Sequence, residues 1–213
     1  VAIITPFNFP IEIPALQLFG ALFMGNHPTL HVDHRVCVVM EQFLRLCIDC
    51  GLDPSAVDML NGPGSAMGEF LHQAPPRNTL FTGSSQVAEM LSAQLGGKVM
   101  LEDAGFDWKV LGPDIAGQGE SMVEYVAWQC DQDAYACSGQ KCSAQSLLAM
   151  HQAWSDTDLL DRMRALAQRR QLEDLTIGPV LTWTTEAMLE HVDRVASLPG
   201  AEVLWGGKAL EGH

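Results

Sequence analysis

Positive charge and long uninterrupted apolar runs are both scarce in this sequence of 213 residues. Lys and Arg together number 12 against 26 Asp and Glu, which gives a formal net charge of −14. Such an acidic chain is not expected to bind nucleic acid or an anionic membrane surface. Its apolar start is interrupted by Pro6, Pro10 and Pro14, and no basic segment flanks it. We therefore predict neither a membrane-spanning helix nor a signal peptide in this stretch.

Cysteine and histidine are too thinly spread to suggest a disulfide framework or a metal centre. Six cysteines are few for a chain of this length. Cys47 and Cys50 form a C-x-x-C pair, but they lie in an apolar, helix-like stretch without a second cysteine pair or a histidine nearby. The seven histidines lack metal-ligand spacing, since His27, His31 and His34 simply follow one another around a predicted strand end. The sequence favours reduced thiols and predicts no metal site.

Apolar, β-prone runs alternate with stretches of helical length in the first half of the chain. The predicted strands cover residues 2–4, 29–32, 57–60, 80–82 and 98–101. The predicted helices cover residues 13–24, 36–50, 66–73 and 86–94. Strands joined by helical crossovers are typical of an α/β fold with a doubly wound, Rossmann-like parallel sheet. Such sheets bind nucleotides outside the carboxyl ends of their strands.

The pattern changes after Asp107, where a polar, glycine-containing loop interrupts it. Beyond this loop we expect helices over residues 122–135, 157–169 and 185–197, a turn at residues 138–142, and strands over residues 144–150 and 202–205. We expect a domain boundary near residue 137, which divides the chain into residues 1–136 and 137–213.

Two glycine-containing turns each follow a predicted strand and open a predicted helix. They span residues 81–84 (FTGS) and residues 61–65 (NGPGS). The backbone N–H groups and helix dipole at such a turn can hold a phosphate. Neither turn matches a GxGxxG fingerprint or a P-loop, so a plain strand-to-helix connection remains the alternative for each.

Three side chains are candidates for chemistry, each with a simpler alternative. Cys142 follows Gly139 in a sharp turn and adjoins Lys141, whose charge favours a thiolate, but a buried inert cysteine is the more usual outcome for an isolated one. Glu102 closes a strand at the edge where this fold places its sites, or is a solvated strand-end charge. Asn8 lies among apolar residues and prolines, where its amide could hold an oxyanion or bond to its own turn.

In combination, these segments resemble the aldehyde dehydrogenase superfamily over essentially the whole chain. The resemblance rests on residues 5–10 (TPFNFP), 25–26 (GN) and 81–84 (FTGS), on Glu102, and on residues 139–142 (GQKC), in that order. The sequences of residues 101–109 (LEDAGFDWK) and 131–146 (DQDAYACSGQKCSAQS) resemble those of one branch of the superfamily. This branch is the plant-type Δ1-pyrroline-5-carboxylate dehydrogenases, family 12 of the aldehyde dehydrogenases.

The resemblance implies oxidation of L-glutamate γ-semialdehyde to L-glutamate with NAD⁺, a step of proline breakdown. It implies Cys142 as nucleophile, Asn8 at the oxyanion and Glu102 as general base. The cofactor-binding residues that it implies are Thr5, Pro6, Phe7, His31, His34, Gly62, Gly64, Thr82, Gly83, Ser84 and Asp103. A different aldehyde substrate, or a non-catalytic remnant of the fold, is the alternative.

The resemblance also implies the mitochondrial matrix, with the cytoplasm as alternative, and a homo-oligomeric parent enzyme. Residues 1–136 would be a cofactor-binding domain lacking its N-terminal part, and residues 137–213 the start of a second α/β catalytic domain that continues beyond them. We expect the 213-residue chain alone to be inactive. His31 and His34 depart from the family's pattern near the adenosine ribose, where lysine is usual at the position of His31. The preference for NAD over NADP therefore stays open.

Overall fold

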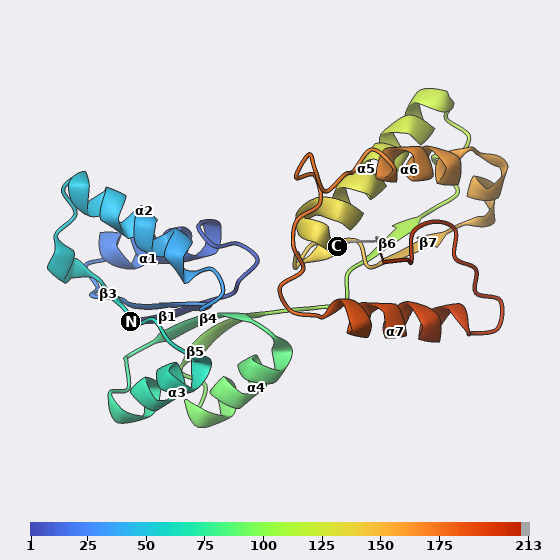
Figure 1. Cartoon of the computed structure of the whole chain (residues 1–213). Coiled ribbons are helices and arrows are strands. Elements are labelled where there is room, and N and C mark those ends of the chain that lie inside the picture. Colours follow the sequence, from blue (N-terminus) through green and yellow to red (C-terminus); the bar gives the residue numbers. More distant parts are fainter. Residues whose placement is uncertain (210–213) are drawn as a thin grey trace. The chain divides into compact units, whose positions relative to one another are not determined.

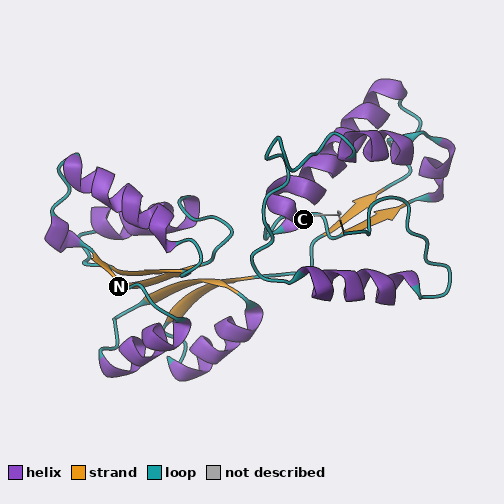
Figure 2. Ribbon diagram, viewed as in Figure 1, coloured by secondary structure: helices purple, strands orange, loops and turns teal. Residues whose placement is uncertain are grey.

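The computed structural model describes residues 1–209, which fold into two compact units. The first unit is Val1–Gly105 and the second begins at Phe106 (Figures 1 and 2). This division falls earlier in the chain than the boundary expected near residue 137. The assignment of the two parts to cofactor binding and to catalysis stays a prediction.

A five-stranded parallel sheet forms the centre of the first unit. Its strands are β1 (Ala2–Thr5), β2 (Thr29–Val32), β3 (Asp58–Met59), β4 (Thr79–Gly83) and β5 (Val99–Asp103). They lie in the order β3-β2-β1-β4-β5, and every neighbouring pair is parallel. The doubly wound, Rossmann-like sheet predicted from the sequence is therefore confirmed.

Four helices cover the two faces of this sheet (Figure 1). They are α1 (Glu12–Phe23), α2 (Cys37–Asp49), α3 (Gly64–Gln73) and α4 (Ser85–Gln94). Helices α1 and α2 pack on one face over a core that includes Ile3 and Leu30, whereas α3 and α4 pack on the other over Ala2 and Phe81. Successive strand residues thus alternate between the two cores, as a sheet covered on both faces requires.

The second unit has little sheet. Its strands β6 (Trp108–Leu111) and β7 (Leu147–Met150) form a parallel pair. Its helices are α5 (Glu120–Tyr135), α6 (Leu159–Ala167) and α7 (Thr185–Ala196), with 3₁₀ turns at Ala136–Gly139 and Gln152–Asp156. The core lies between α5 and α6, where Cys130 and Leu159 are fully or almost fully buried.

Sequence and structure differ at three places in this unit. Strand β6 was not predicted, β7 begins later than the strand expected at residues 144–150, and residues 202–205 form no strand. A strand needs a neighbour that accepts and donates its backbone hydrogen bonds. Within residues 1–209 the 202–205 segment pairs with no strand, so its apolar composition does not suffice.

Candidate functional site

The strand order creates a switch point between β1 and β4. From β1 the chain moves outward to β2 and β3, then returns to the other side of β1 with β4 and β5. Ligands of open α/β sheets bind in the crevice outside the carboxyl ends of the strands at such a point. Residues 5–8 begin at the last residue of β1, and residues 82–84 run from the end of β4 to the N-cap of α4, so two of the segments selected from the sequence flank the switch point.

A row of polar side chains crosses this edge on the face covered by α1. Thr82 and Glu102 are in register on β4 and β5, and Thr5 and Thr82 each directly follow the last paired residues of β1 and β4, Ile4 and Phe81. Residues in register on parallel strands point to the same face. Gln17 of α1 donates from Nε2 to Thr82 Oγ1 at 3.2 Å. The structure therefore brings the predicted base Glu102 to the same face as two of the predicted cofactor residues.

Buried polar atoms without partners lie around this row. They are Thr5 Oγ1, Asn8 Oδ1 and Gln17 Oε1, none of which has a hydrogen-bond partner in the described part of the chain. Thr5 is only 3% exposed. An unsatisfied buried polar atom costs stability, so each calls for a bound group or an ordered water.

The turn after β1 is held by its neighbour after β2. Arg35 lies over the ring of Phe7, with its Cζ 4.8 Å from the ring centroid. Arg35 also donates to both carboxylate oxygens of Asp33, at 2.8 Å and 2.6 Å. The Arg35 guanidinium holds the pKa of Asp33 below its usual range, against the opposing effect of partial burial. The segment that carries Pro6 and Asn8 is thus anchored on β2 through an aromatic ring and an ion pair.

His31 lies on the opposite face of the sheet, toward α3. Its Nε2 is 3.1 Å from the carbonyl oxygen of Gly62, and because that oxygen can only accept, Nε2 carries the proton. In the neutral imidazole Nδ1 is an acceptor, and it is buried without a partner among residues 1–209. His31 is 5% exposed, whereas His34 lies open beside Asp33. The two histidines singled out from the sequence therefore have different environments.

The glycines of the two turns have different roles. A Cβ at Gly83 would lie 2.6 Å from the ring of Phe81, a core residue, so packing excludes any larger side chain there. At Gly62 the nearest atom would be at an ordinary 3.6 Å, and at Gly64 there is open space. Ser84 is the N-cap residue of α4, and its side chain makes no capping bond. Only Gly83 is thus explained by packing.

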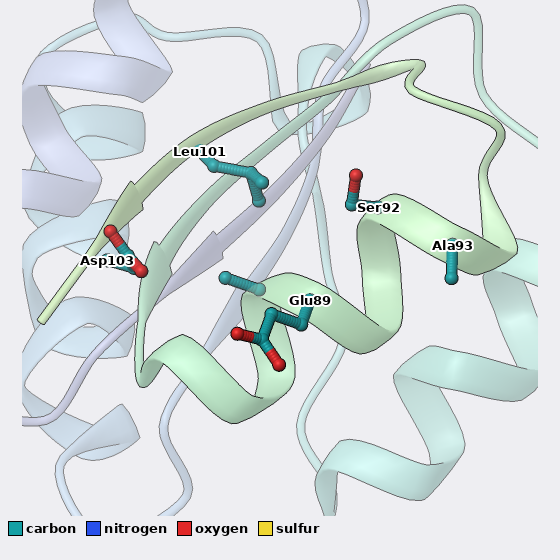
Figure 3. Close-up of a pocket in the computed structure, with 6 residues that line it drawn as sticks. Glu89, Ser92, Ala93, Leu101 and Asp103 are labelled. Carbon is teal, nitrogen blue, oxygen red and sulfur yellow. The ribbon is translucent and has the colours of Figure 1, made fainter.

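Asp103 faces away from Glu102. Side chains alternate along β5, and Leu101 and Asp103 point to a shallow hollow beside α4 (Figure 3). The hollow is lined by Ala88, Glu89, Ser92, Ala93, Leu101 and Asp103. Its two carboxylates, Glu89 and Asp103, make it a poor place for a phosphate. Asp103 is thus at the carboxyl edge, as predicted, but on the other face from Glu102.

Cys142 lies in the second unit, in the turn that follows α5. It is an exposed free thiol. The turn begins with three consecutive residues of positive φ, Cys137, Ser138 and Gly139, at 52°, 54° and 76°. Ser138 Oγ donates to the carbonyl oxygen of Gly178 at 2.7 Å, which ties the turn to a loop forty residues on. Cys142 is accordingly an accessible thiol on a sharply bent backbone, and not the buried cysteine of the alternative interpretation.

Lys141 has an acidic neighbour as well as the adjacent thiol. Although burial opposes it, hydrogen bonds from Lys109 and Gln129 hold the pKa of Asp133 below its usual range, and the Lys141 charge adds to this effect. The Asp133 carbonyl also accepts from the backbone N–H of Gln145 at 3.0 Å. Lys141 therefore acts on the Asp133 carboxylate, as well as being adjacent to Cys142 in the chain.

Two glutamines contribute to these sites although the sequence reading did not select them. Gln17 reaches Thr82 from a largely apolar helix, and Gln140 bridges the cysteine turn to residues 179–181. Gln17 could have been selected from the sequence because it is a lone amide side chain among apolar neighbours in α1. The signal for Gln140 was its place between Gly139 and Cys142, inside the motif itself.

Other kinds of site find no support in the described residues. Residues 1–209 hold no group of three or more His, Cys, Asp or Glu side chains placed to bind a metal ion. No described helix combines the length and apolar character that crossing a bilayer requires.

Comparison with known proteins finds a family match and similar relatives that agree with each other. Residues 1–213 match the family described as the aldehyde dehydrogenase family. The chain is 61% identical over its whole length to the mitochondrial Delta-1-pyrroline-5-carboxylate dehydrogenase 12A1 of Arabidopsis thaliana, and spans 37% of that protein.

Solved structures share the fold. A 1-pyrroline-5-carboxylate dehydrogenase of Thermus thermophilus superimposes with a TM-score of 0.83 at 25% identity, covering 99% of this chain and 42% of that one. A succinate-semialdehyde dehydrogenase of Burkholderia pseudomallei superimposes with a TM-score of 0.87 at 22% identity, covering 99% and 44%. The chain thus spans less than half the length of the relatives that it matches.

Proposed function

The chain belongs to the aldehyde dehydrogenase family, and from this premise we propose that its full-length protein oxidises L-glutamate γ-semialdehyde to L-glutamate with NAD⁺. The substrate is proposed from the 61% identity to an Arabidopsis protein named for the cyclic form of this aldehyde. The observation that carries the reaction type is the switch point, because residues 5–8 and 82–84 flank it and Glu102 shares a face with Thr5 and Thr82.

The first unit is suited to a dinucleotide. The buried, unpartnered atoms Thr5 Oγ1, Asn8 Oδ1 and His31 Nδ1 lie near the carboxyl edge of the sheet and can accept hydrogen bonds from a ligand's hydroxyl or amide groups. We propose that the backbone of Gly83 and Ser84 approaches the pyrophosphate at the start of α4. Pro6, Phe7, His34, Gly62, Gly64, Thr82 and Asp103 complete the proposed cofactor site.

The proposed reaction uses three side chains. The Cys142 thiolate attacks the aldehyde carbon, and the resulting oxyanion accepts hydrogen bonds from the Asn8 amide and the Cys142 backbone N–H. Bound NAD⁺ supplies the chemistry of a hydride acceptor. Loss of hydride from the thiohemiacetal leaves a thioester on Cys142. Glu102 then takes a proton from a water that attacks the thioester carbonyl, which releases glutamate and the Cys142 thiolate.

An activity assay on the purified full-length protein tests this proposal. It compares glutamate γ-semialdehyde, succinate semialdehyde and acetaldehyde, each with NAD⁺ and NADP⁺, by the rate of reduced cofactor formation. We expect the largest kcat/KM with glutamate γ-semialdehyde and NAD⁺. A larger value with another aldehyde or with NADP⁺ would move the proposal to that substrate or cofactor. No reduction with any aldehyde would favour a non-catalytic remnant of the fold.

The 213-residue chain by itself is expected to give no turnover. Trp108 and Val110 of β6 and Met100 of β5 expose more than 60% of their surface, and the edges of both sheets are open. Exposed apolar strands of this kind favour aggregation. Steady NADH formation by this chain alone, under the conditions of the full-length assay, would contradict the expectation.

The location and assembly of the full-length protein are also proposals. We propose the mitochondrial matrix because the Arabidopsis relative is named as mitochondrial, with the cytoplasm as alternative. We propose a homo-oligomer, which light scattering after size-exclusion chromatography tests. Microscopy of a C-terminally tagged full-length protein distinguishes the two locations.

A further inference from the structure

The backbone before Cys142 adopts a conformation that its residues do not favour. Cys137 and Ser138 both have left-handed φ and ψ values, 52° and 31° for the first and 54° and 38° for the second. This left-handed region is disfavoured for residues with a Cβ. Where such residues do adopt it, they usually do so singly, and two consecutive residues rarely adopt it together. Such a conformation persists only where its surroundings enforce it. The turn therefore needs stabilising contacts with other parts of the chain.

The side chain of Gln140 makes most of these contacts, as hydrogen bonds. Its Nε2 donates to the carbonyl oxygen of Cys137 at 3.1 Å and to that of Pro179 at 2.9 Å. Its Oε1 accepts from the backbone N–H of Leu181 at 2.9 Å. Both amide hydrogens and the amide oxygen are thus used, and they join the turn to a loop about forty residues later. The bond from Ser138 Oγ to Gly178 adds a second connection.

The position of Cys142 depends on the backbone on either side of it. The residue is exposed, so packing does not determine where its thiol lies. Downstream, the backbone N–H groups of Ala144 and Gln145 bond to the carbonyl oxygens of Lys141 and Asp133 at 3.3 Å and 3.0 Å. The chain is therefore anchored just after Cys142 by backbone bonds and just before it by the Gln140 side chain.

We propose that Gln140 is a positioning residue for Cys142, and that it acts by clasping the turn of residues 137–142 onto residues 178–181, with Ser138 in support. This rests on the proposed function, in which Cys142 is the nucleophile. A nucleophile displaced by about 1 Å can lose about 10²-fold in rate although its chemistry is unchanged. Gln140 contacts neither substrate nor cofactor in this account, and its effect reaches the reaction through the backbone.

The chemistry of the side chain predicts a graded series. Glutamate can still accept from Leu181 but cannot donate to the carbonyl oxygens of Cys137 and Pro179, which its charge would also repel. Alanine removes all three bonds without adding a repulsion. We therefore expect Gln140→Glu to be at least as harmful as Gln140→Ala, whereas Ser138→Ala loses one bond of the four and is milder.

The test uses the full-length enzyme with these three variants, Cys142→Ala, and the control Gln73→Ala. Gln73 is an exposed glutamine on α3 whose Nε2 bonds to Glu69 Oε1 of the same helix. For each variant kcat, the KM for aldehyde, the binding constant and stoichiometry of NAD⁺, and the melting temperature are measured. We expect Gln140→Ala to lower kcat about 10²-fold with full NAD⁺ stoichiometry and a KM near that of the wild type. Ser138→Ala should fall in between, and Gln73→Ala should match the wild type.

The outcomes separate the two proposals. If Cys142→Ala is inactive but Gln140→Ala and Ser138→Ala keep wild-type kcat, Gln140 is no positioning residue and the proposed function stands. If Cys142→Ala stays active, the proposed nucleophile is wrong, whatever Gln140 does. If kcat falls only in proportion to lost NAD⁺ sites, Gln140 merely maintains folding and the proposal is overturned. Should Gln140→Ala not fold, Ser138→Ala decides by the same split between kcat and NAD⁺ stoichiometry.

Discussion

The two units of this chain are organised by different kinds of contact. In Val1–Gly105, neighbouring strands pair in a regular parallel ladder, and helices cover both faces. Between Phe106 and residue 209 there are two strands, and the candidate nucleophile lies on a turn joined by side-chain hydrogen bonds to a distant loop. The framework for a cofactor thus comes from repeated local patterns. The placement of Cys142 comes from a few specific long-range bonds.

This contrast predicts that the units respond differently to substitution. Changes at the switch point of the first unit should weaken cofactor binding or the base-catalysed step. Changes in the second unit should remove acylation or loosen its packing, and should leave cofactor binding largely intact. The following substitutions, all in the full-length protein, test this separation.

The largest effect is expected at Cys142. Cys142→Ala removes the only group in the proposed mechanism that can form the thioester, so aldehyde oxidation should fall about 10⁴-fold or more. NAD⁺ binding, measured by titration calorimetry, should stay within about twofold, since the proposed cofactor residues lie in the first unit. Cys50→Ala is the matched control, because Cys50 is also an exposed free thiol. Retention of most activity in Cys142→Ala would exclude it as nucleophile.

Glu102 tests the other unit. Loss of a general base typically costs about 10²–10⁴-fold, so Glu102→Gln should lower the steady-state rate by this amount. Rapid mixing should still give a burst of NADH, as the thioester forms and then waits for water. Glu89→Gln, which changes a carboxylate of α4 on the opposite face of the sheet, should leave both phases unchanged. A missing burst would mean that Glu102 also deprotonates Cys142.

Asp131 tests the packing of the second unit. Its side chain is fully buried and receives two bonds from Arg170, at 2.6 Å and 2.7 Å. Removing one partner of a buried ion pair leaves the other charge without its counter-ion, here that of Arg170. Asp131→Ala should therefore lower the free energy of unfolding by about 3–5 kcal/mol. Asp161→Ala, which removes an exposed partner of Arg164, should cost less than about 1 kcal/mol. Equal urea midpoints for the two variants would contradict this difference.

The smallest effect is the pH dependence expected from Asp33 in the first unit. Because its folded-state pKa lies below the unfolded value, the stability it contributes is present above about pH 4 and is lost as pH falls through the folded pKa. Asp33→Asn should therefore reduce the drop in unfolding free energy between neutral pH and about pH 3. Asp49→Asn is the control, because Asp49 is an exposed aspartate on α2. Asp53 would not serve, because hydrogen bonds from Ser55 lower its pKa as well. Identical pH profiles for Asp49→Asn and Asp33→Asn would contradict the account.

The sequence predicted the first unit well because its rules are local. The expected bounds of α2, residues 36–50, differ from Cys37–Asp49 by one residue at each end, since an apolar stripe and the following Gly51 mark the helix. Within the site, the sequence places Glu102 at the end of a strand, and β5 ends one residue later at Asp103, while the catalytic role of Glu102 and the cofactor-binding role of Asp103 stay predictions. Alternation along β5 separates the two, and this depends on knowing which face each residue occupies.

The second unit was predicted less well because its decisive contacts join distant residues. The apolar run at residues 202–205 has strand-like composition but lacks a pairing strand within residues 1–209. The strained turn before Cys142 could not be read from Cys137 and Ser138, whose types do not favour positive φ. Its conformation follows from bonds to residues 178–181, and no sequence pattern links those residues to the cysteine motif.

The most direct test of the proposed nucleophile is to trap the acyl group. Full-length Glu102→Gln enzyme is mixed with glutamate γ-semialdehyde and NAD⁺, quenched in acid, digested, and analysed by mass spectrometry. The proposed mechanism predicts a γ-glutamyl thioester on the peptide that contains Cys142, formed only when NAD⁺ is present. An adduct on Cys137 or on another cysteine, or turnover without any acylated peptide, would contradict the assignment of Cys142 as the nucleophile.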